Sequence, residues 1–206
     1  MATTSQTFTD LPNVIGAQTW TCPAGVSAIQ AEVWAEGGPG HGNDGSGFGA
    51  GGSGGGAYSK RYYIPVTPGK TYNVNRYVDN SPIYLRSAII GESGITCNAE
   101  KGIGGIEADG GAGGLAANGN GDEKTSGSNG ATTSNANGGA GGAGGNGGAG
   151  GAGGTSGSRT GGVGTSPGGG AGGNYANELG PYPKGGDSKT ILTWTIPTNI
   201  SVCTVS

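Results

Sequence analysis

The chain has 206 residues, of which 52 are glycine and 10 are proline, and its formal net charge is −3. So much glycine is typical of low-complexity or fibrous chains rather than of enzymes with large cores. The small negative charge, with a single short basic stretch, "SKRYY" at 59–63, excludes nucleic-acid binding through a basic surface.

Segments rich in β-branched and aromatic residues predict strands in the N-terminal part of the chain. In chain order they are "TWTCP" (19–23), "AIQAEVW" (28–34), "YSKRYYIPV" (58–66), "TYNVNRYV" (71–78) and "PIYLRSAII" (82–90). The turn sequence "TPGK" at Thr67–Lys70 joins two of them. Together they make a strand-rich flank over residues 7–90.

Glycine triplets mark the middle of the chain. "GGAGGAGGNGGAGGAGGT" spans Gly138–Thr155, with a different residue only at every third position. This period excludes a strand, whose side chains alternate with period two, and collagen, which has one glycine per triplet and much proline. A polyglycine II helix fits, because the polyproline II conformation has three residues per turn. A disordered linker is the alternative.

Such a helix has no internal hydrogen bonds, so its N–H and C=O groups need neighbouring helices, which bare glycine edges allow to approach. The tract and the shorter glycine runs therefore predict a bundle of about five to seven short helices, concentrated over residues 100–175. As one straight helix, the 18-residue tract would reach about 56 Å at roughly 3.1 Å per residue. Substitutions to Ser or Thr should be tolerated at Ala143 and Ala149, whereas Val at Gly144 or Gly147 should separate helices.

The predicted fold is all-β with a bundle of short polyglycine II helices and little or no α-helix, because no segment has a helical apolar stripe with caps. "KTILTWTIP" (189–197) predicts a last strand within a C-terminal flank over residues 188–203. This strand and the N-terminal strands should form a small β-sheet layer that clamps the ends of the bundle. Residues 1–206 are thus expected to form a single glycine-rich domain.

Three motifs precede the glycine-rich middle in a specific order: "TWTCPAGV" (19–26), "AEVWAEGGPG" (31–40) and "IPVTPGKTY" (64–72). In this order they resemble the glycine-rich domain of bacteriophage virion proteins, notably tail-fibre adhesins. The resemblance extends from about Phe8 to about Ile196. It implies a sandwich of polyglycine II helices whose connecting loops form an exposed tip.

Groups that could perform catalysis are scarce. The single histidine, His41, is interpreted as an exposed loop residue, and "GFGAGG" (47–52) matches a phosphate-loop pattern without the helix that should follow it. Cys22, Cys97 and Cys203 have neither disulfide-framework nor CxxC spacing and are interpreted as buried or incidental thiols. We therefore expect no enzymatic activity, no cofactor and no metal.

Polar loops between the glycine runs hold the candidate receptor contacts. Charged residues concentrate in the loop 115–137, one arginine lies in "TSGSRTGG" (155–162), and two tyrosines in "NYANELGPYP" (174–183) could stack on a ligand. Solvated turns and core packing are the alternatives. Gly121–Thr133 is expected to lie outside the glycine bundle and to be replaceable without loss of the fold. The candidate residues are Asp122, Glu123, Lys124, Arg159, Tyr175 and Tyr182.

These features predict a non-enzymatic phage virion surface protein, either a tail-fibre adhesin that binds a receptor or a capsid decoration. The expected partners are other virion proteins of the tail fibre or capsid, further copies of the chain as a homo-oligomer, and a host-surface glycan or outer-membrane receptor. Neither nucleic-acid binding nor membrane insertion is expected. A secretory signal is not recognisable, so we expect synthesis in the host cytoplasm and a location on the virion surface. The alternative is an ice-binding polyglycine II protein with flat faces of alanine and threonine.

Overall fold

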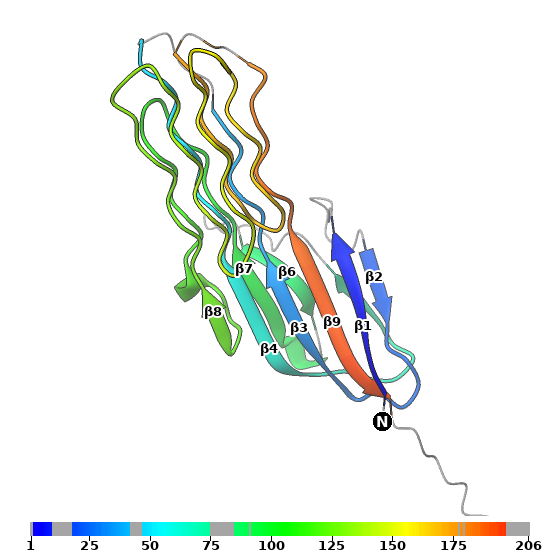
Figure 1. Cartoon of the computed structure of the whole chain (residues 1–206). Helices are drawn as coiled ribbons and strands as arrows, with labels where there is room; N and C mark the ends of the chain where they lie inside the picture. The colour runs from blue at the N-terminus through cyan, green and yellow to red at the C-terminus, as the bar shows by residue number, and fades with distance from the viewer. Residues whose placement is uncertain are drawn as a thin grey trace, which may run out of the picture.

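The computed structural model describes residues 2–9, 18–41, 47–74, 85–90, 92–176, 178 and 180–196. Two parts follow one another along the long axis of the molecule: a β-sheet base, and a bundle of undulating segments that extends from one end of it (Figure 1). The chain passes several times between the two parts, so that strands of the base continue directly into segments of the bundle.

The larger sheet of the base has five antiparallel strands in the order β1-β9-β3-β4-β8. The C-terminal strand lies between the N-terminal strand and β3, so both flanks of the chain close one sheet, as predicted. The strands are β1 (Ala2–Thr9), β9 (Lys189–Ile196), β3 (Ala28–Trp34), β4 (Tyr58–Pro65) and β8 (Glu123–Thr125).

Two smaller sheets cover one face of the larger sheet. Their strands are β2 (Gln18–Thr21) with β5 (Thr71–Val74), and β6 (Leu85–Ile90) with β7 (Thr96–Glu100). The described residues also contain two short 3-10 helices, η1 (Glu92–Gly94) and η2 (Ala116–Asn118), and no α-helix. Of the predicted strands 71–78 and 82–90, only the parts 71–74 and 85–90 are seen, because residues 75–84 lie outside the described residues.

Alternation along the strands places the apolar side chains between the layers. In β3, Ile29 and Val33 are buried in the core cluster, while Gln30 and Glu32 face the opposite side of the sheet. Trp194 of β9 packs in the same core, where its ring centroid lies 5.3 Å from that of Trp20. The other face of the larger sheet, which we call the outer face, carries the polar side chains.

Backbone hydrogen bonds between extended segments build the bundle, and there are more segments than the five to seven predicted. The prediction was too low because parts of both flanks also join the bundle. The segments are 35–41, 49–57, 101–106, 109–114, 126–133, 138–145, 147–155, 160–165, 168–174 and 183–187.

Residues 49–57, the first inner helix, are buried throughout. Successive N–H groups donate to three different segments, and the fourth returns to the first, which requires three residues per turn. These bonds are Gly52 to Ala131 (2.9 Å), Ser53 to Ala171 (2.8 Å), Gly54 to Ile103 (2.8 Å) and Gly55 to Ser128 (2.9 Å). Carbonyl groups of the same helix accept from three other segments, 35–41, 109–114 and 138–145. This pattern confirms the polyglycine II bundle.

Residues 168–174, the second inner helix, are also buried throughout and lie beside the first. The other segments form a hydrogen-bonded ring around these two helices. In order around the ring they are 126–133, 109–114, 101–106, 35–41, 183–187, 160–165, 147–155 and 138–145. Each inner helix is thus enclosed on every side by backbone, which explains why it contains only residues no larger than serine or asparagine.

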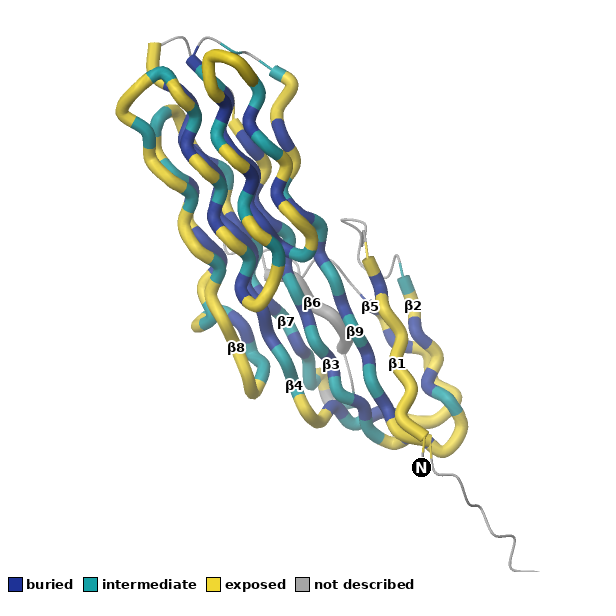
Figure 2. Tube along the Cα trace, in the orientation of Figure 1, coloured by how far each residue is buried: buried dark blue, intermediate teal, exposed yellow. Residues whose placement is uncertain are grey.

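The triplet tract lies in the ring, and its third-position residues are exposed from Ala140 to Thr155, as predicted for one free edge. Buried and exposed residues alternate along these segments in Figure 2. The single straight helix was a wrong prediction, because the tract turns at Asn146, and Gly141 donates to Gly151 of the returning segment (2.8 Å). Asn146 has φ +52°, a left-handed conformation that asparagine tolerates better than alanine does.

A second prediction was also wrong: residues 126–133 are not outside the bundle. Gly127 donates to Gly114 (2.9 Å) and Gly130 donates to Gly111 (2.9 Å), so this segment is part of the ring. Each of these two glycines packs directly against the first inner helix, since a Cβ atom on either would lie 2.0 Å from one of its carbonyl oxygens. One glycine at every third position is enough to make this contact.

Candidate functional site

The structure separates the six candidate residues into two groups. The connections that hold Arg159, Tyr175 and Tyr182 lie near the end of the bundle that is remote from the base, whereas Glu123 and Lys124 belong to β8, at an edge of the base (Figure 1). Asp122 directly precedes β8. The expectation that these charged residues occupy bundle loops like that of Arg159 is therefore wrong, because β8 pairs with β4 of the sheet.

At the remote end, which we call the tip, an ion pair and a hydrogen bond connect two turns. The Arg159 Nε atom lies 3.0 Å from Glu178 Oε2, and the N–H of Tyr175 donates to the Arg159 carbonyl oxygen (2.8 Å). Tyr182 is 60% exposed, and its ring lies 6.1 Å from that of His41. The tip therefore offers a cation, an aromatic ring and an imidazole, on connections between bundle segments or at the end of one.

Asn174 fixes the tip, and sequence reasoning missed it. Its side chain is fully buried, its Oδ1 accepts the N–H of Gly161 (3.0 Å), and its Nδ2 donates to the carbonyl oxygen of Pro181 (3.3 Å). A buried amide with both ends bonded holds the turns in place. The signal in the sequence is an asparagine where the run "GGGAGGN" would otherwise continue in small residues.

At the edge of the base, the acidic candidates converge on Tyr62 of β4. Asp122 Oδ2 accepts the backbone N–H of Tyr62 (2.8 Å), and Glu123 Oε1 accepts its hydroxyl. The ammonium group of Lys60 lies 4.9 Å from the centre of the same ring. Lys124 instead donates to the carbonyl oxygen of Gly119 (3.2 Å). The charges thus orient an aromatic side chain that is itself 50% exposed.

Tyr62 lines a groove of about 510 Å³ on the outer face of the larger sheet. The groove opens where β3 and β9 part, because their ladder ends at the pair Gln30 and Thr193. Its wall is formed by Thr3, Gly25, Ser27, Ala28, Ile29, Gln30, Tyr62, Thr193, Trp194 and Thr195.

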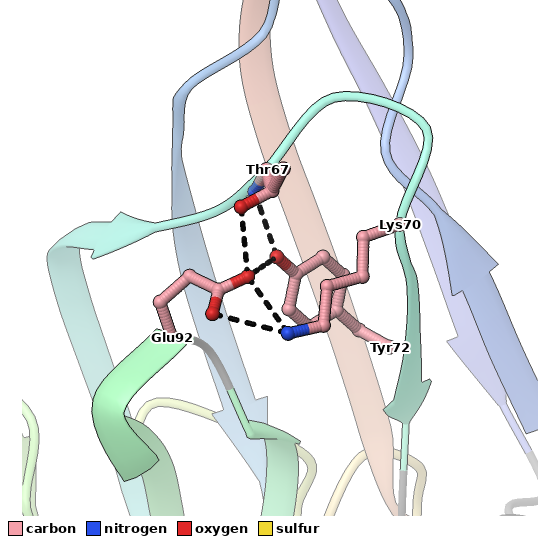
Figure 3. Close-up of polar contacts among 4 residues, drawn as sticks. All are labelled: Thr67, Lys70, Tyr72 and Glu92. Atoms are coloured by element: carbon pink, nitrogen blue, oxygen red, sulfur yellow. Dashed lines mark hydrogen bonds and ion pairs between the residues drawn. The ribbon is translucent and has the colours of Figure 1, made fainter.

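A second polar cluster ties the turn after β4 to η1 (Figure 3). Glu92 Oε1 accepts from Thr67 Oγ1 (2.9 Å), from Lys70 Nζ (3.0 Å) and from the Tyr72 hydroxyl. Those hydrogen bonds, that of Tyr72 foremost, lower the pKa of Glu92 to about 2. Thr67, Lys70 and Tyr72 all donate to the same carboxylate, so we interpret the cluster as a structural link.

Glu92→Gln should make stability less dependent on pH. The folded-state pKa of Glu92 is depressed, so its contribution is complete above pH 4.5, its ordinary pKa, and is lost as the pH falls towards 2. At pH 7 the variant should melt below the wild type, and this difference should shrink between pH 4.5 and pH 2. Thermal unfolding monitored by near-UV circular dichroism provides the measurement. A difference of constant size from pH 7 to pH 2 would contradict the role of the carboxylate.

Among the described residues, Cys22, Cys97 and the phosphate-loop pattern offer no reactive site. Burial raises the pKa of Cys97 to about 12 and also raises that of Cys22, so both remain protonated thiols, and both are unpaired and buried. Cys203 lies outside the described residues. Within "GFGAGG" (47–52), the N–H groups from Gly49 onward donate to carbonyl groups of other bundle segments or of the turns that connect them, so none of them is left for a phosphate.

Among the described residues there is no group of three His, Cys, Asp or Glu side chains arranged to hold a metal ion. The same residues form no helix long and apolar enough to span a membrane.

The fold and these sites define a β-sheet base that carries a polyglycine II bundle. A family model described as a glycine-rich domain matches residues 12–76, which include β2 to β5 and the first inner helix. A search of curated proteins found no significant match to the chain.

Proposed function

We propose that the chain is a non-enzymatic surface protein of a bacteriophage virion, with the base towards the particle and the tip towards the host. The order of the three N-terminal motifs, which resembles that of phage tail-fibre adhesins, supports the phage assignment. In this proposal the tip binds a host-surface glycan or outer-membrane receptor, and the partners at the base are tail-fibre or capsid proteins. Decoration of the capsid is the variant of this function in which the tip has no receptor.

The observation that carries the proposal is the separation of the tip from the base by the length of the bundle (Figure 1). Each inner helix is hydrogen-bonded on all sides, so the bundle cannot bend without breaking buried backbone bonds. Recognition residues on loops held by a rigid scaffold are typical of binding proteins. Arg159, Tyr175 and Tyr182 have this placement, and Asn174 and the ion pair to Glu178 restrict their turns.

The edges of the larger sheet support attachment through the base. Among the described residues, β1 pairs only with β9, and its sequence "ATTSQTFT" contains neither a charge nor a proline. Natural edge strands usually carry such residues because an open edge recruits other strands. The opposite edge does carry them, in the three-residue β8 with Glu123 and Lys124. The edge of β1 that has no strand partner among the described residues therefore suits strand addition by a neighbouring subunit.

Tyr182→Ala should lower adsorption of virions to host cells by at least about tenfold, the loss expected for an aromatic anchor at a binding site. Tyr182 is largely exposed, so the melting temperature should stay unchanged. Tyr63→Ala is the matched control, because Tyr63 is 65% exposed but belongs to β4 of the base. Adsorption is measured on virions carrying each variant, and immunogold labelling locates the protein on the particle.

Unchanged adsorption with labelled capsids would favour decoration over receptor binding. Absence of label from intact virions would overturn the proposal in both forms.

Ice binding is the second candidate, and one observation favours it. Ala140, Ala143, Ala149 and Ala152 are exposed on two adjacent antiparallel segments, so small apolar side chains repeat across one side of the bundle. We expect no thermal hysteresis at micromolar protein concentration. Measurable hysteresis would favour this candidate over the virion function.

A further inference from the structure

The groove on the outer face exists because two neighbouring strands separate before they end. β3 begins at Ala28 and β9 continues to Ile196, yet the last pair of their ladder is Gln30 with Thr193. Beyond that pair, β9 remains paired with β1, as in the pair Thr3 and Thr195. A hollow of about 510 Å³ therefore lies between the start of β3 and the end of β9, with Tyr62 beside it.

The groove is lined by uncharged polar side chains together with the apolar residues Ala28, Ile29 and Trp194. Hydroxyl groups come from Thr3, Ser27, Thr193 and Thr195, and an amide group comes from Gln30. Among the described residues that line the groove, none is acidic or basic. An ionic ligand would lose hydration without gaining a counter-charge, whereas a neutral ligand with many hydroxyl groups would find both donors and acceptors.

Tyr62 supplies an apolar surface that is held in one orientation. Its hydroxyl donates to Glu123, its backbone N–H donates to Asp122, and Lys60 lies against its ring. Orienting an exposed aromatic ring before binding removes part of the entropy cost of binding. An exposed, oriented tyrosine beside hydroxyl and amide groups combines an apolar face with hydrogen-bonding partners.

We propose that this groove binds a unit of a neutral glycan. The apolar C–H face of the sugar ring packs against Tyr62, and sugar hydroxyl groups exchange hydrogen bonds with Gln30 and Thr193. Asp122 and Glu123 act as positioning residues, because they contact Tyr62 and are not among the lining residues. The site lies on the base rather than at the tip, so it does not depend on the receptor-binding role proposed for the tip.

The probes for this site are the neutral oligomers of glucose, galactose and N-acetylglucosamine, with sialyllactose as an anionic sugar and an uncharged threonine-rich peptide as a strand-like ligand. Titration of the full chain is followed by calorimetry and by 1H–15N NMR. We expect at least one neutral oligomer to bind at millimolar concentration or below and to shift the Gln30 and Thr193 amide signals. Sialyllactose and the peptide should not shift them.

Two variants test the assignment of residues. Tyr62→Ala removes the ring, and Thr193→Val removes one hydroxyl at nearly constant shape, and each should weaken binding of the neutral oligomer by at least about tenfold. Glu123→Gln weakens the hydrogen bond that orients the ring. It should weaken binding less than Tyr62→Ala does and leave the amide signals of the tip unchanged. Tyr63→Ala, an exposed tyrosine of the same strand that does not line the groove, should bind like the wild type.

The proposal is overturned if no neutral oligomer binds, if only the peptide or sialyllactose binds, or if Tyr62→Ala and Thr193→Val bind as tightly as the wild type. Sugar-induced shifts confined to Tyr175 and Tyr182 would also overturn it, while supporting recognition at the tip.

Discussion

Gly52→Ala is expected to unfold the bundle or to lower its stability severely, although it adds a single methyl group. A Cβ atom at Gly52 would lie 1.9 Å from the carbonyl oxygen of Ala140, far inside van der Waals contact. The first inner helix and segment 138–145 would have to separate. That movement breaks the bonds that Gly139 and Gly142 donate to the inner helix (2.9 and 2.8 Å).

Each of the two N–H groups costs roughly 1–3 kcal/mol when it is left buried and unpaired, so their loss alone costs about 2–6 kcal/mol. That is a large part of the roughly 5–15 kcal/mol by which a typical domain is stable. The expected result is a lower melting temperature with a loss of amide protection throughout the first inner helix. Hydrogen exchange and calorimetry measure both quantities.

Ala140→Ser is the matched control, because it also adds one heavy atom, on the other side of the same contact. The side chain of Ala140 is exposed, so this variant should change the free energy of unfolding by no more than about 0.5 kcal/mol. Equal melting temperatures for the two variants would mean that the glycines only reflect composition and do not hold the helices together.

The elements that the sequence predicts well are those in which one periodicity determines burial. β3 occupies 28–34 as predicted, since "AIQAEVW" alternates apolar and polar residues with one face in the core. The burial pattern of the triplet tract was also predictable. Its period of three gives a helix with two edges of bare glycine and one edge of side chains, and that edge is exposed. In both cases local spacing decides which side of the chain is covered.

The arrangement of the bundle could not be derived in the same way. A period of three identifies the edges of a helix but not the neighbours that pack on them, because all glycine edges are alike. The most enclosed helix is 49–57, a short run in a flank that otherwise predicts strands. Its distinguishing feature is the absence of any side chain larger than serine, a stricter pattern than the triplets of Gly138–Thr155.

The charged residues of the candidate site could be recognised in the sequence, but the contacts that they make could not. Asp122, Glu123 and Lys124 stand out as charges in a polar segment, but three residues are too short for a strand signal, so their pairing with β4 was not predictable. The role of Asp122 and Glu123 depends on Tyr62, which is 60 residues away from Asp122 along the chain. Only the fold brings these residues together.

The glycine positions in segment 126–133 provide a composition-neutral test of the bundle. Exchanging Gly127 and Ser128 leaves the composition unchanged but moves the bare edge by one residue. A Cβ atom at 127 would lie 2.0 Å from the carbonyl oxygen of Gly55, in the first inner helix. We expect the double variant Gly127→Ser/Ser128→Gly to lose the bonds from Gly127 to Gly114 and from Gly55 to Ser128, both 2.9 Å long.

With roughly 1–3 kcal/mol for each of the two N–H groups left unpaired, the exchange should destabilise the chain by at least about 2–6 kcal/mol. Ser128→Gly alone is the control: Ser128 is exposed, so this change should cost no more than about 1 kcal/mol, the price of a more flexible backbone. The measurement is chemical denaturation of the wild type and both variants. If segment 126–133 were a solvated loop, the exchange and the control would unfold at the same denaturant concentration, because a loop does not distinguish glycine at 127 from glycine at 128. A midpoint that falls much further for the exchange than for the control is therefore expected only if every third residue faces the inner helix.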